Sequence, residues 1–266
     1  MKRVRLRIAY RGTAYHGWQR QQSVQTVEGA ILDALQKILN APSVDAIPFQ
    51  GASRTDAGVH ALAQTAHFDH DTSHDEWTFV RGLNALTPDD ITIIRAEEVD
   101  PSFDARRSAR GKIYRYQIWN HRFPHPLLLR DAWHVSRELD RDAMQEAANL
   151  LLGEHDFAGF RASDCQAATT TRHIWRMDVE SEPSNPLITI WVEGDAFLKY
   201  MVRILSGTLM EVGTGRFAPE HVLEILATGD RALAGVTAPP WGLTLMKLFY
   251  PDFPWQRGEP DIGSMW

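Results

Sequence analysis

The chain has 266 residues, of which 44% are apolar and 23% charged, and its formal net charge is −6. This composition is typical of a globular protein with one large or two moderate domains, and it excludes wholesale disorder. The single cysteine, Cys165, excludes an intramolecular disulfide framework and a cysteine-based zinc site. No apolar run reaches the roughly 18 residues of a membrane span, and the N-terminus lacks a signal peptide's apolar core. We therefore expect a soluble, cytoplasmic protein.

The charge is unevenly distributed. Residues 1–27, the first basic stretch, carry six Lys or Arg and no acid, and residues 105–122, the second basic stretch, do the same. Setting this +12 against −6 overall leaves −18 on the other 221 residues. Such segregation is typical of a protein that binds a polyanion. The alternative is that the stretches are solvated strand faces that happen to be basic.

Six elements are expected in the first part of the chain, in the order strand, helix, strand, strand, helix, strand. By residue range they are 4–10, 27–40, 46–51, 63–69, 75–86 and 91–99. Thr26 is an N-cap candidate for the first helix, whose apolar face includes Ile31 and Leu35. A turn signal at residues 87–89 (TPD) ends the second helix.

The second part repeats this order. Its elements are expected at residues 112–120, 140–152, 169–182, 187–194, 197–213, 218–228 and 243–250, where 218–228 is an additional short helix. We therefore expect an α+β fold of two pseudo-symmetric, ferredoxin- or RRM-like βαββαβ halves. They would cover residues 1–105 and 106–266 and form an extended, mainly antiparallel sheet with helices on one face.

Asp56 is the first candidate for chemistry, in a loop between two expected strands. It lies in the sequence GASRTDAGVHA (residues 51–61), where small neighbours leave room for a ligand to approach the carboxylate. The alternative is an Asx turn, in which the Asp56 side chain bonds to nearby backbone. By spacing alone, the turn is the simpler interpretation.

Arg203 is the second candidate, because it is a charge within an otherwise apolar expected helix. Arginine does not lose its proton, so an inward-facing Arg203 must find a carboxylate, and Asp56 is a plausible partner. Such a pair would keep Asp56 ionised by lowering its pKa. The alternative is an arginine that reaches water from the edge of the apolar face.

Tyr114 and Tyr116 share one face of the strand expected at 112–120, inside the second basic stretch. Aromatic side chains among basic ones are suited to base stacking, although either tyrosine could instead be a core residue. His67, His70 and His74, with two nearby aspartates, do not share one face of a helix or strand, so no metal site is expected there. The sequence has no P-loop, dinucleotide-binding or nucleophile-elbow motif.

Nine sequence blocks carry a more specific signal. They are residues 9–21 (AYRGTAYHGWQRQ), 26–30 (TVEGA), 54–61 (RTDAGVHA), 83–86 (LNAL), 112–116 (KIYRY), 156–157 (DF), 160–161 (FR), 201–203 (MVR) and 237–243 (TAPPWGL). Together they resemble the tRNA pseudouridine synthase A family of bacteria along nearly the whole chain. The chain departs from the family pattern at Ser53, at Lys199 and Tyr200, and at 103–108 (FDARRS), so tRNA contacts around 104–107 and 199–200 are open.

The resemblance implies two pseudo-symmetric α/β halves, a homodimer, and conversion of uridine to pseudouridine at positions 38, 39 and 40 of the tRNA anticodon arm. It implies that Asp56 is the catalytic carboxylate, Tyr114 the active-site tyrosine and Arg203 the partner of Asp56. Arg54 would help to hold the flipped nucleotide. Basic residues of the second basic stretch would contact tRNA phosphates; they are Arg106, Arg110 and Lys112.

The implied reaction breaks the N1–C1′ glycosidic bond and joins C5 to C1′ without net redox change or hydrolysis. It therefore requires no cofactor and no metal. Asp56 either attacks C1′ or removes a sugar proton, while Tyr114 can stack on the base and remove the C5 proton.

Two other functions are compatible with parts of the sequence. A non-catalytic RRM-like RNA-binding protein would carry an RNP1 run, which is missing from the sequence. A glycoside hydrolase would need two catalytic carboxylates, and only Asp56 is a convincing candidate.

Overall fold

The computed structural model describes residues 1–182 and 184–251, and the chain forms two compact units. Among the described residues, unit 1 contains Met1–Arg110 and residues 245–251, and unit 2 contains residues 111–244. The division expected between residues 105 and 106 differs in two respects: the chain enters unit 2 after Arg110, and its last strand returns to unit 1. Residues 252–266, the end of the expected second half, lie outside the described residues.

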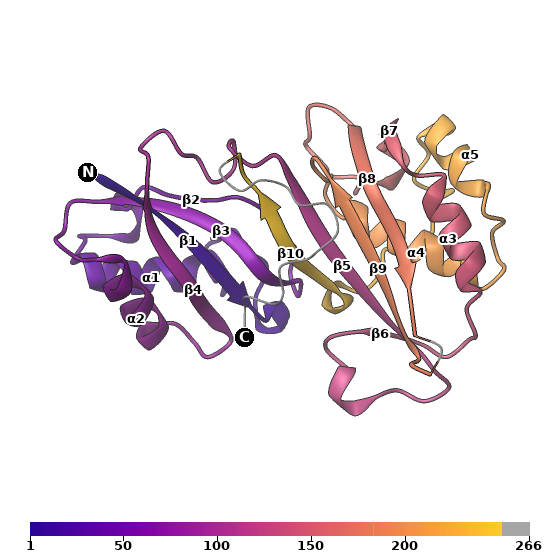
Figure 1. Ribbon diagram of the computed structural model, residues 1–266, viewed down its shortest axis with the longest axis horizontal. Helices are drawn as coiled ribbons and strands as arrows, with labels where there is room; N and C mark the ends of the chain where they lie inside the picture. The colour runs from indigo at the N-terminus through magenta and orange to yellow at the C-terminus, as the bar shows by residue number, and fades with distance from the viewer. Residues whose placement is uncertain (183, 252–266) are drawn as a thin grey trace. The chain divides into compact units, whose positions relative to one another are not determined.

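Unit 1 has the expected order of strands and helices (Figure 1). Its elements are β1 (Lys2–Tyr10), α1 (Val27–Leu39), β2 (Phe49–Gly51), β3 (His60–His70), α2 (Glu76–Leu86) and β4 (Ile91–Val99), joined by β10 (Leu243–Phe249) from Leu245 on. The strand order is β4-β1-β3-β10, and β2 also pairs with β3. Strand β1 is antiparallel to both β3 and β4.

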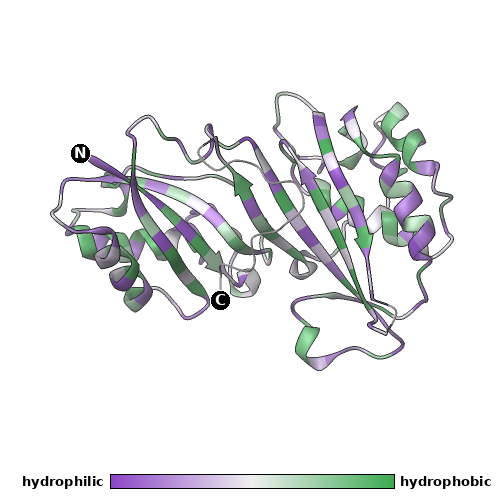
Figure 2. Ribbon diagram, in the orientation of Figure 1, coloured by the Kyte–Doolittle hydropathy of each residue, from purple (hydrophilic) through white to green (hydrophobic). Residues whose placement is uncertain are grey.

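Strand β1 shows why one face of this sheet is apolar. Successive side chains of a strand point to opposite sides, so Val4, Leu6 and Ile8 lie together and are at most 2% exposed. Arg3 and Arg5 point to the other side. Figure 2 shows the alternation of hydropathy along the strands, and the helices α1 and α2 pack side by side in this unit. The Thr26 hydroxyl caps α1 by accepting from Gly29 N at 3.2 Å, which confirms the expected N-cap.

Unit 2 repeats the strand, helix, strand, strand, helix order. Its elements are β5 (Gly111–Asn120), β6 (Trp133–Val135), α3 (Arg141–Asn149), β7 (Gly153–Asp156), β8 (Thr171–Glu180), β9 (Leu187–Gly194), α4 (Met201–Gly213) and α5 (His221–Thr228). The strand order is β5-β9-β8-β7, with all three pairs antiparallel, and β6 is parallel to β5. The α+β class with mainly antiparallel strands is confirmed. Among the described residues, no helix is long and apolar enough to cross a membrane.

Three local expectations differ from the structure. Strand β2 begins at Phe49, not at residue 46, because Pro48 has no N–H to donate and residues Val44–Ala46 form a 3-10 helix. Helix α4 begins at Met201, not at residue 197: Phe197 and Leu198 continue the apolar pattern from a loop. The short strands β6 and β7 were not expected.

Ion pairs neutralise much of the first basic stretch. The Arg3 guanidinium donates to both carboxylate oxygens of Asp69, at 2.7 and 2.8 Å. Other pairs join basic residues of this stretch to acids outside it: Arg5 with Glu97, Lys2 with Glu98 and Arg20 with Asp45. These four residues of the first basic stretch therefore each have an acidic partner within unit 1.

We expect Asp69→Asn to lower the free energy of unfolding by about 2 kcal/mol at pH 7, because Arg3 loses its charged acceptor. The side chains of Arg3 and Asp69 are only 21% and 16% exposed. The hydrogen bond from Arg3 lowers the pKa of Asp69. The wild-type contribution is therefore complete above the unfolded carboxyl pKa of about 4 and is lost as the pH falls through the lower folded value. Urea unfolding between pH 7 and pH 2 measures the difference, and equal stability at pH 7 would contradict the prediction.

Candidate active site

The loop that carries Asp56 joins β2 to β3 and is closed at its base by Gln64. This side chain is fully buried, accepts from Ser53 N at 3.2 Å and donates to Ser53 O at 2.5 Å. Ala52 N also donates to Thr65 O across the two strands. Because both bonds run to the backbone of Ser53, they do not depend on the side chain at this position, where the chain departs from the family pattern.

The sequence block at residues 9–21 holds the tip of the same loop. Trp18 N donates to Thr55 O at 3.1 Å, and Gly58 N donates to Tyr15 O at 3.3 Å. These bonds bracket Asp56 on both sides along the chain. The backbone of the loop is therefore satisfied by a second, fixed piece of backbone, which restricts the position of Asp56.

Side-chain hydrogen bonds also join residues 9–21 to residues 54–61. The hydroxyls of Tyr10 and Thr55 form a buried hydrogen bond of 2.6 Å. Gly12 N donates to Nδ1 of His60 at 3.0 Å, which ties the first residues of β3 to the end of β1. Residues 9–21 and 54–61 are thus two parts of one local structure.

Two glycines allow this close approach. Gly17 has φ +92°, and a Cβ at this position would lie 2.8 Å from Thr55 O. A Cβ at Gly12 would lie 1.9 Å from Val59 O. Either side chain would push the Asp56 loop away, so the glycines of the first block are required by the second.

Asp56 itself is half-buried, whereas Thr55 before it is only 7% exposed. Arg54 is exposed, and its charge acts on Glu28 at the start of α1. Burial raises the pKa of Glu28, although Arg20 and Arg54 oppose the shift. The loop thus combines a fixed backbone with a carboxylate and a guanidinium two residues apart.

We expect Gly17→Ala to lower the free energy of unfolding by more than about 2 kcal/mol, because it adds a clash with Thr55 O to the cost of a positive φ. Gly215→Ala is the matched control, since Gly215 has φ +73° and nothing within 4 Å of its added Cβ. The control should lose only about 1 kcal/mol. Chemical denaturation of both variants measures the difference, and equal losses would show that the close approach costs nothing.

Tyr114 lies on β5 of unit 2 and is 7% exposed. Its ring meets that of Phe197 edge-on, with centroids 5.3 Å apart. Tyr116, on the same face of the strand, is fully buried and donates its hydroxyl to Pro239 O at 2.9 Å. Tyr116 is therefore a core residue, as one of the two alternatives for these tyrosines allowed.

Arg203 is the third residue of α4 and is half-buried among apolar neighbours. Its Nε donates to Ala238 O at 2.8 Å, and its guanidinium lies 4.6 Å from the ring centre of Tyr200. Tyr200 precedes the helix in the left-handed conformation, with φ 64°. These contacts hold Arg203 within the protein, unlike an arginine that merely reaches for water from the edge of a helix.

The second basic stretch is more open than the first. Arg106 and Arg110 are exposed in unit 1, and Lys112 is half-buried at the start of β5. The Asp104 carboxylate accepts from the backbone N–H groups of Arg106 and Arg107. Burial alone would raise the pKa of Asp104, but these N–H groups outweigh it and the pKa is lowered. The departure from the family pattern at residue 104 thus builds a turn that presents two arginines.

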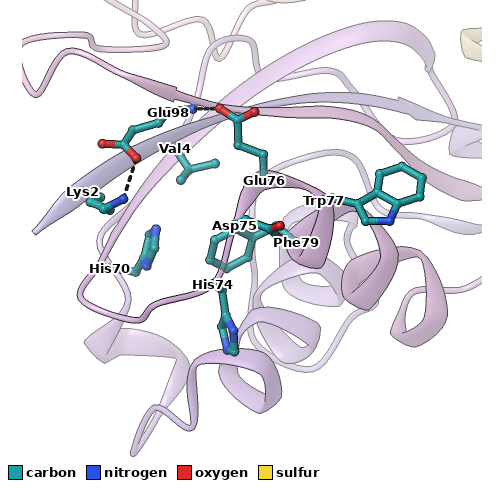
Figure 3. Close-up of a pocket in the computed structure, with 9 residues that line it drawn as sticks. All are labelled: Lys2, Val4, His70, His74, Asp75, Glu76, Trp77, Phe79 and Glu98. Atoms are coloured by element: carbon teal, nitrogen blue, oxygen red, sulfur yellow. Dashed lines mark hydrogen bonds and ion pairs between the residues drawn. The ribbon is translucent and has the colours of Figure 1, made fainter.

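The histidines considered as metal ligands make structural contacts. His67 accepts from Ala105 N at 3.1 Å, and the ring of His70 packs on Phe79. Within residues 1–182 and 184–251, no three His, Cys, Asp or Glu side chains are grouped as metal ligands would be. A pocket of about 340 Å³ beside α2 (Figure 3) contains none of the predicted site residues; it is lined by Lys2, Val4, His70, His74, Asp75, Glu76, Trp77, Phe79 and Glu98.

The predicted site residues divide between the units, Arg54 and Asp56 in unit 1 and Tyr114 and Arg203 in unit 2. Within unit 2, Tyr114 contacts Phe197, which lies six residues before Arg203 along the chain. The sequence reasoning assigned no role to residues that support the site, such as Gly17 and Phe197. The block at 9–21 was the available signal for Gly17.

Comparisons with known proteins agree with these features. A family model described as tRNA pseudouridine synthase matches residues 7–106 and 147–251. The chain is 45% identical to tRNA pseudouridine synthase A of Myxococcus xanthus over 96% of this chain and 94% of the relative. The enzyme of the same name from Pelobacter propionicus is 46% identical over 94% of this chain and 100% of the relative. A solved H/ACA RNP bound to a substrate RNA aligns at a TM-score of 0.37 with 13% identity, over 83% of this chain and 43% of that chain.

Proposed function

Because the chain belongs to the tRNA pseudouridine synthase family, we propose that it isomerises uridine to pseudouridine at positions 38, 39 and 40 of the tRNA anticodon arm. The observation that carries this proposal is the Asp56 loop, whose backbone is held by residues 15–18. An isomerase that moves a base on its own sugar needs a carboxylate in one fixed place, since small displacements cost large factors in rate. A non-catalytic RNA-binding protein has no such need, and the family assignment does not favour it.

Asp56 is the catalytic carboxylate in this proposal. It acts on the target nucleotide either by attack on C1′ or by removal of a sugar proton, and both routes begin from the ionised form. Arg203 is the partner that the sequence resemblance implies for Asp56, since an opposite charge favours the ionised carboxylate. The half-buried place of Arg203 in an apolar helix supports this role, because a charge there benefits from an opposite charge.

Tyr114 stacks on the target base after the base has left its own stack. The edge-on contact with Phe197 restricts the ring of Tyr114, so the stacking surface is preformed. Leaving the stack costs a few kcal/mol, which contacts to the base edge and backbone must offset. Arg54 is exposed two residues before Asp56 on the same loop, which supports a role in holding the flipped nucleotide.

The reaction breaks the N1–C1′ bond and forms the C5–C1′ bond; overall, C5 loses one proton and N1 gains one. A carboxylate, an arginine and a tyrosine supply the charge and the proton acceptor that these steps need, and we propose that no cofactor or metal takes part. We also propose that the chain acts as a homodimer in the cytoplasm, as its sequence resemblance implies.

We expect Asp56→Asn to reduce pseudouridine formation at least about 1000-fold, because the amide neither attacks nor accepts a proton. Binding of tRNA should change less than about threefold, since the carboxylate serves chemistry more than affinity. Tritium release from C5-labelled uridine in tRNA measures turnover, and filter binding measures affinity. Asp33→Asn, on the exposed side of α1, is the control for loss of one negative charge and should keep full activity. A wild-type rate in Asp56→Asn would remove Asp56 from the mechanism.

We expect the double variant Arg106→Ala/Arg110→Ala to weaken tRNA binding and to reduce the slope of log Kd against log salt concentration by about 2, since each arginine is expected to neutralise one phosphate. Lys2→Ala/Arg95→Ala is the matched control: it removes the same charge, but from residues already paired with Glu98 and Glu97. The control should keep the wild-type slope. Identical slopes in both double variants would show that net charge, not these arginines, governs binding.

A further inference from the structure

Residues 235–242 of unit 2, the strap, follow α5 in the chain and lie against α4. Gly207 of the helix and Gly235 of the strap make this approach possible. A Cβ at Gly207 would lie 1.8 Å from Val236 O, and a Cβ at Gly235 would lie 2.7 Å from the backbone of Thr208. The Thr208 hydroxyl also accepts from Gly235 N at 3.0 Å. The strap is therefore packed backbone to backbone on the helix that carries Arg203.

The strap and Arg203 exchange two hydrogen bonds. Ala238 N donates to Arg203 O at 3.1 Å, and Arg203 Nε donates to Ala238 O at 2.8 Å. Ala238 is fully buried, so water does not compete for its N–H and carbonyl groups. A guanidinium is planar, and fixing Nε also fixes the directions of its two terminal nitrogens. The position of the Ala238 carbonyl therefore sets the direction in which Arg203 presents its charge.

Tyr116 anchors the strap to the sheet one residue further on. Its hydroxyl donates to Pro239 O at 2.9 Å. Gly242 lies on the ring of Tyr116, where a Cβ would be 2.7 Å from Cζ. Burial raises the pKa of Tyr116 far above its ordinary value, so the hydroxyl stays protonated and remains a donor throughout the working pH range.

We propose that Tyr116 is a positioning residue of this enzyme: through Pro239 O and the strap, it sets the orientation of the Arg203 guanidinium. The inference rests on the proposed function, in which Arg203 must point at a carboxylate. Tyr116 does not touch the substrate in this account. It differs in role from Tyr114, two residues earlier on the same strand, which meets the base.

The first test is Tyr116→Phe, which keeps the ring and removes only the bond to Pro239 O. Tyr250→Phe is the matched control, because Tyr250 is also buried, at 5% exposure, and donates its hydroxyl to a backbone carbonyl, Ala105 O, at 2.6 Å in unit 1. The measurement is the single-turnover rate of tritium release with enzyme in saturating excess over tRNA. This rate refers to bound tRNA and does not depend on the fraction of folded enzyme.

We expect Tyr116→Phe to lower this rate at least about tenfold, with tRNA affinity changed less than twofold, because a misdirected group slows the reaction more than binding. Tyr250→Phe should keep the rate within about twofold of wild type. A Tyr116→Phe enzyme as fast as wild type, or an equal loss of rate in both variants, would overturn the inference.

A double-mutant cycle tests whether Tyr116 acts through Arg203. In an Arg203→Lys background the side chain has neither the Nε–H donor nor the planar guanidinium that the strap orients. Adding Tyr116→Phe to this background should therefore slow the reaction further by less than about twofold. A purely structural role would instead give the same factor in both backgrounds, and that result would overturn the inference.

Gly207→Ala gives a second test with a different change. Its Cβ displaces the strap at Val236 and should lower the single-turnover rate at least as much as Tyr116→Phe. Gly82→Ala in α2 is the helical control, since its Cβ meets only the flexible end of Ile38, at 3.0 Å. A wild-type rate in Gly207→Ala would count against the inference. If the wild-type protein formed no pseudouridine, the proposed function would fail first, whereas an active wild type with unaffected strap variants would refute this inference alone.

Discussion

The site depends first on the contact between the turn after β1 and the loop after β2. Hydrogen bonds from Trp18 N to Thr55 O and from Gly58 N to Tyr15 O join two loops that have no regular secondary structure to hold them. Loops of this kind are usually the mobile parts of a fold. Here each loop supplies the other with the partners that its backbone needs, and Gly17 lets them come close enough to do so. The loop that carries Asp56 is therefore held by backbone hydrogen bonds and close packing on both sides of this residue.

Unit 2 solves a similar problem with a helix. The proposed function requires an Arg203 that is charged, partly buried and directed at a carboxylate, and a separate structural feature meets each requirement. Helix α4 places it among apolar neighbours, the ring of Tyr200 lies against its guanidinium, and the Ala238 carbonyl takes one of its donors. Again a glycine, Gly207, allows one piece of backbone to lie directly on another. In both units the residues proposed to do chemistry are of common types. The close backbone packing and the hydrogen-bond acceptors that position them come from the glycines and carbonyls around them.

Much of the fold could be predicted from local patterns, because the strands alternate cleanly and the helices carry caps such as Thr26. The errors have physical causes. Phe197 and Leu198 continue an apolar period that looks helical, but they lie in a loop, where Leu198 is buried and Phe197 is half-buried against Tyr114. The return of the last strand to unit 1 is a long-range pairing that no local pattern encodes. For the site, the residues at 54–61 and 201–203 were recognisable, whereas the link from Tyr116 to Arg203 runs through backbone carbonyls, which leave no trace in side-chain identity.

The ion pairs of β1 have a consequence for how this sheet selects its alignment. Arg3 lies directly opposite Asp69 on β3, and Arg5 lies directly opposite Glu97 on β4. A slip of one residue in either pairing would turn the arginines toward the side where Val4 and Leu6 are now buried beneath the helices. The loss of the ion pairs and the burial of arginine side chains therefore both disfavour a one-residue shift of β1 against β3 or β4. These arginines therefore distinguish the native register of the sheet from one that is shifted by a single residue.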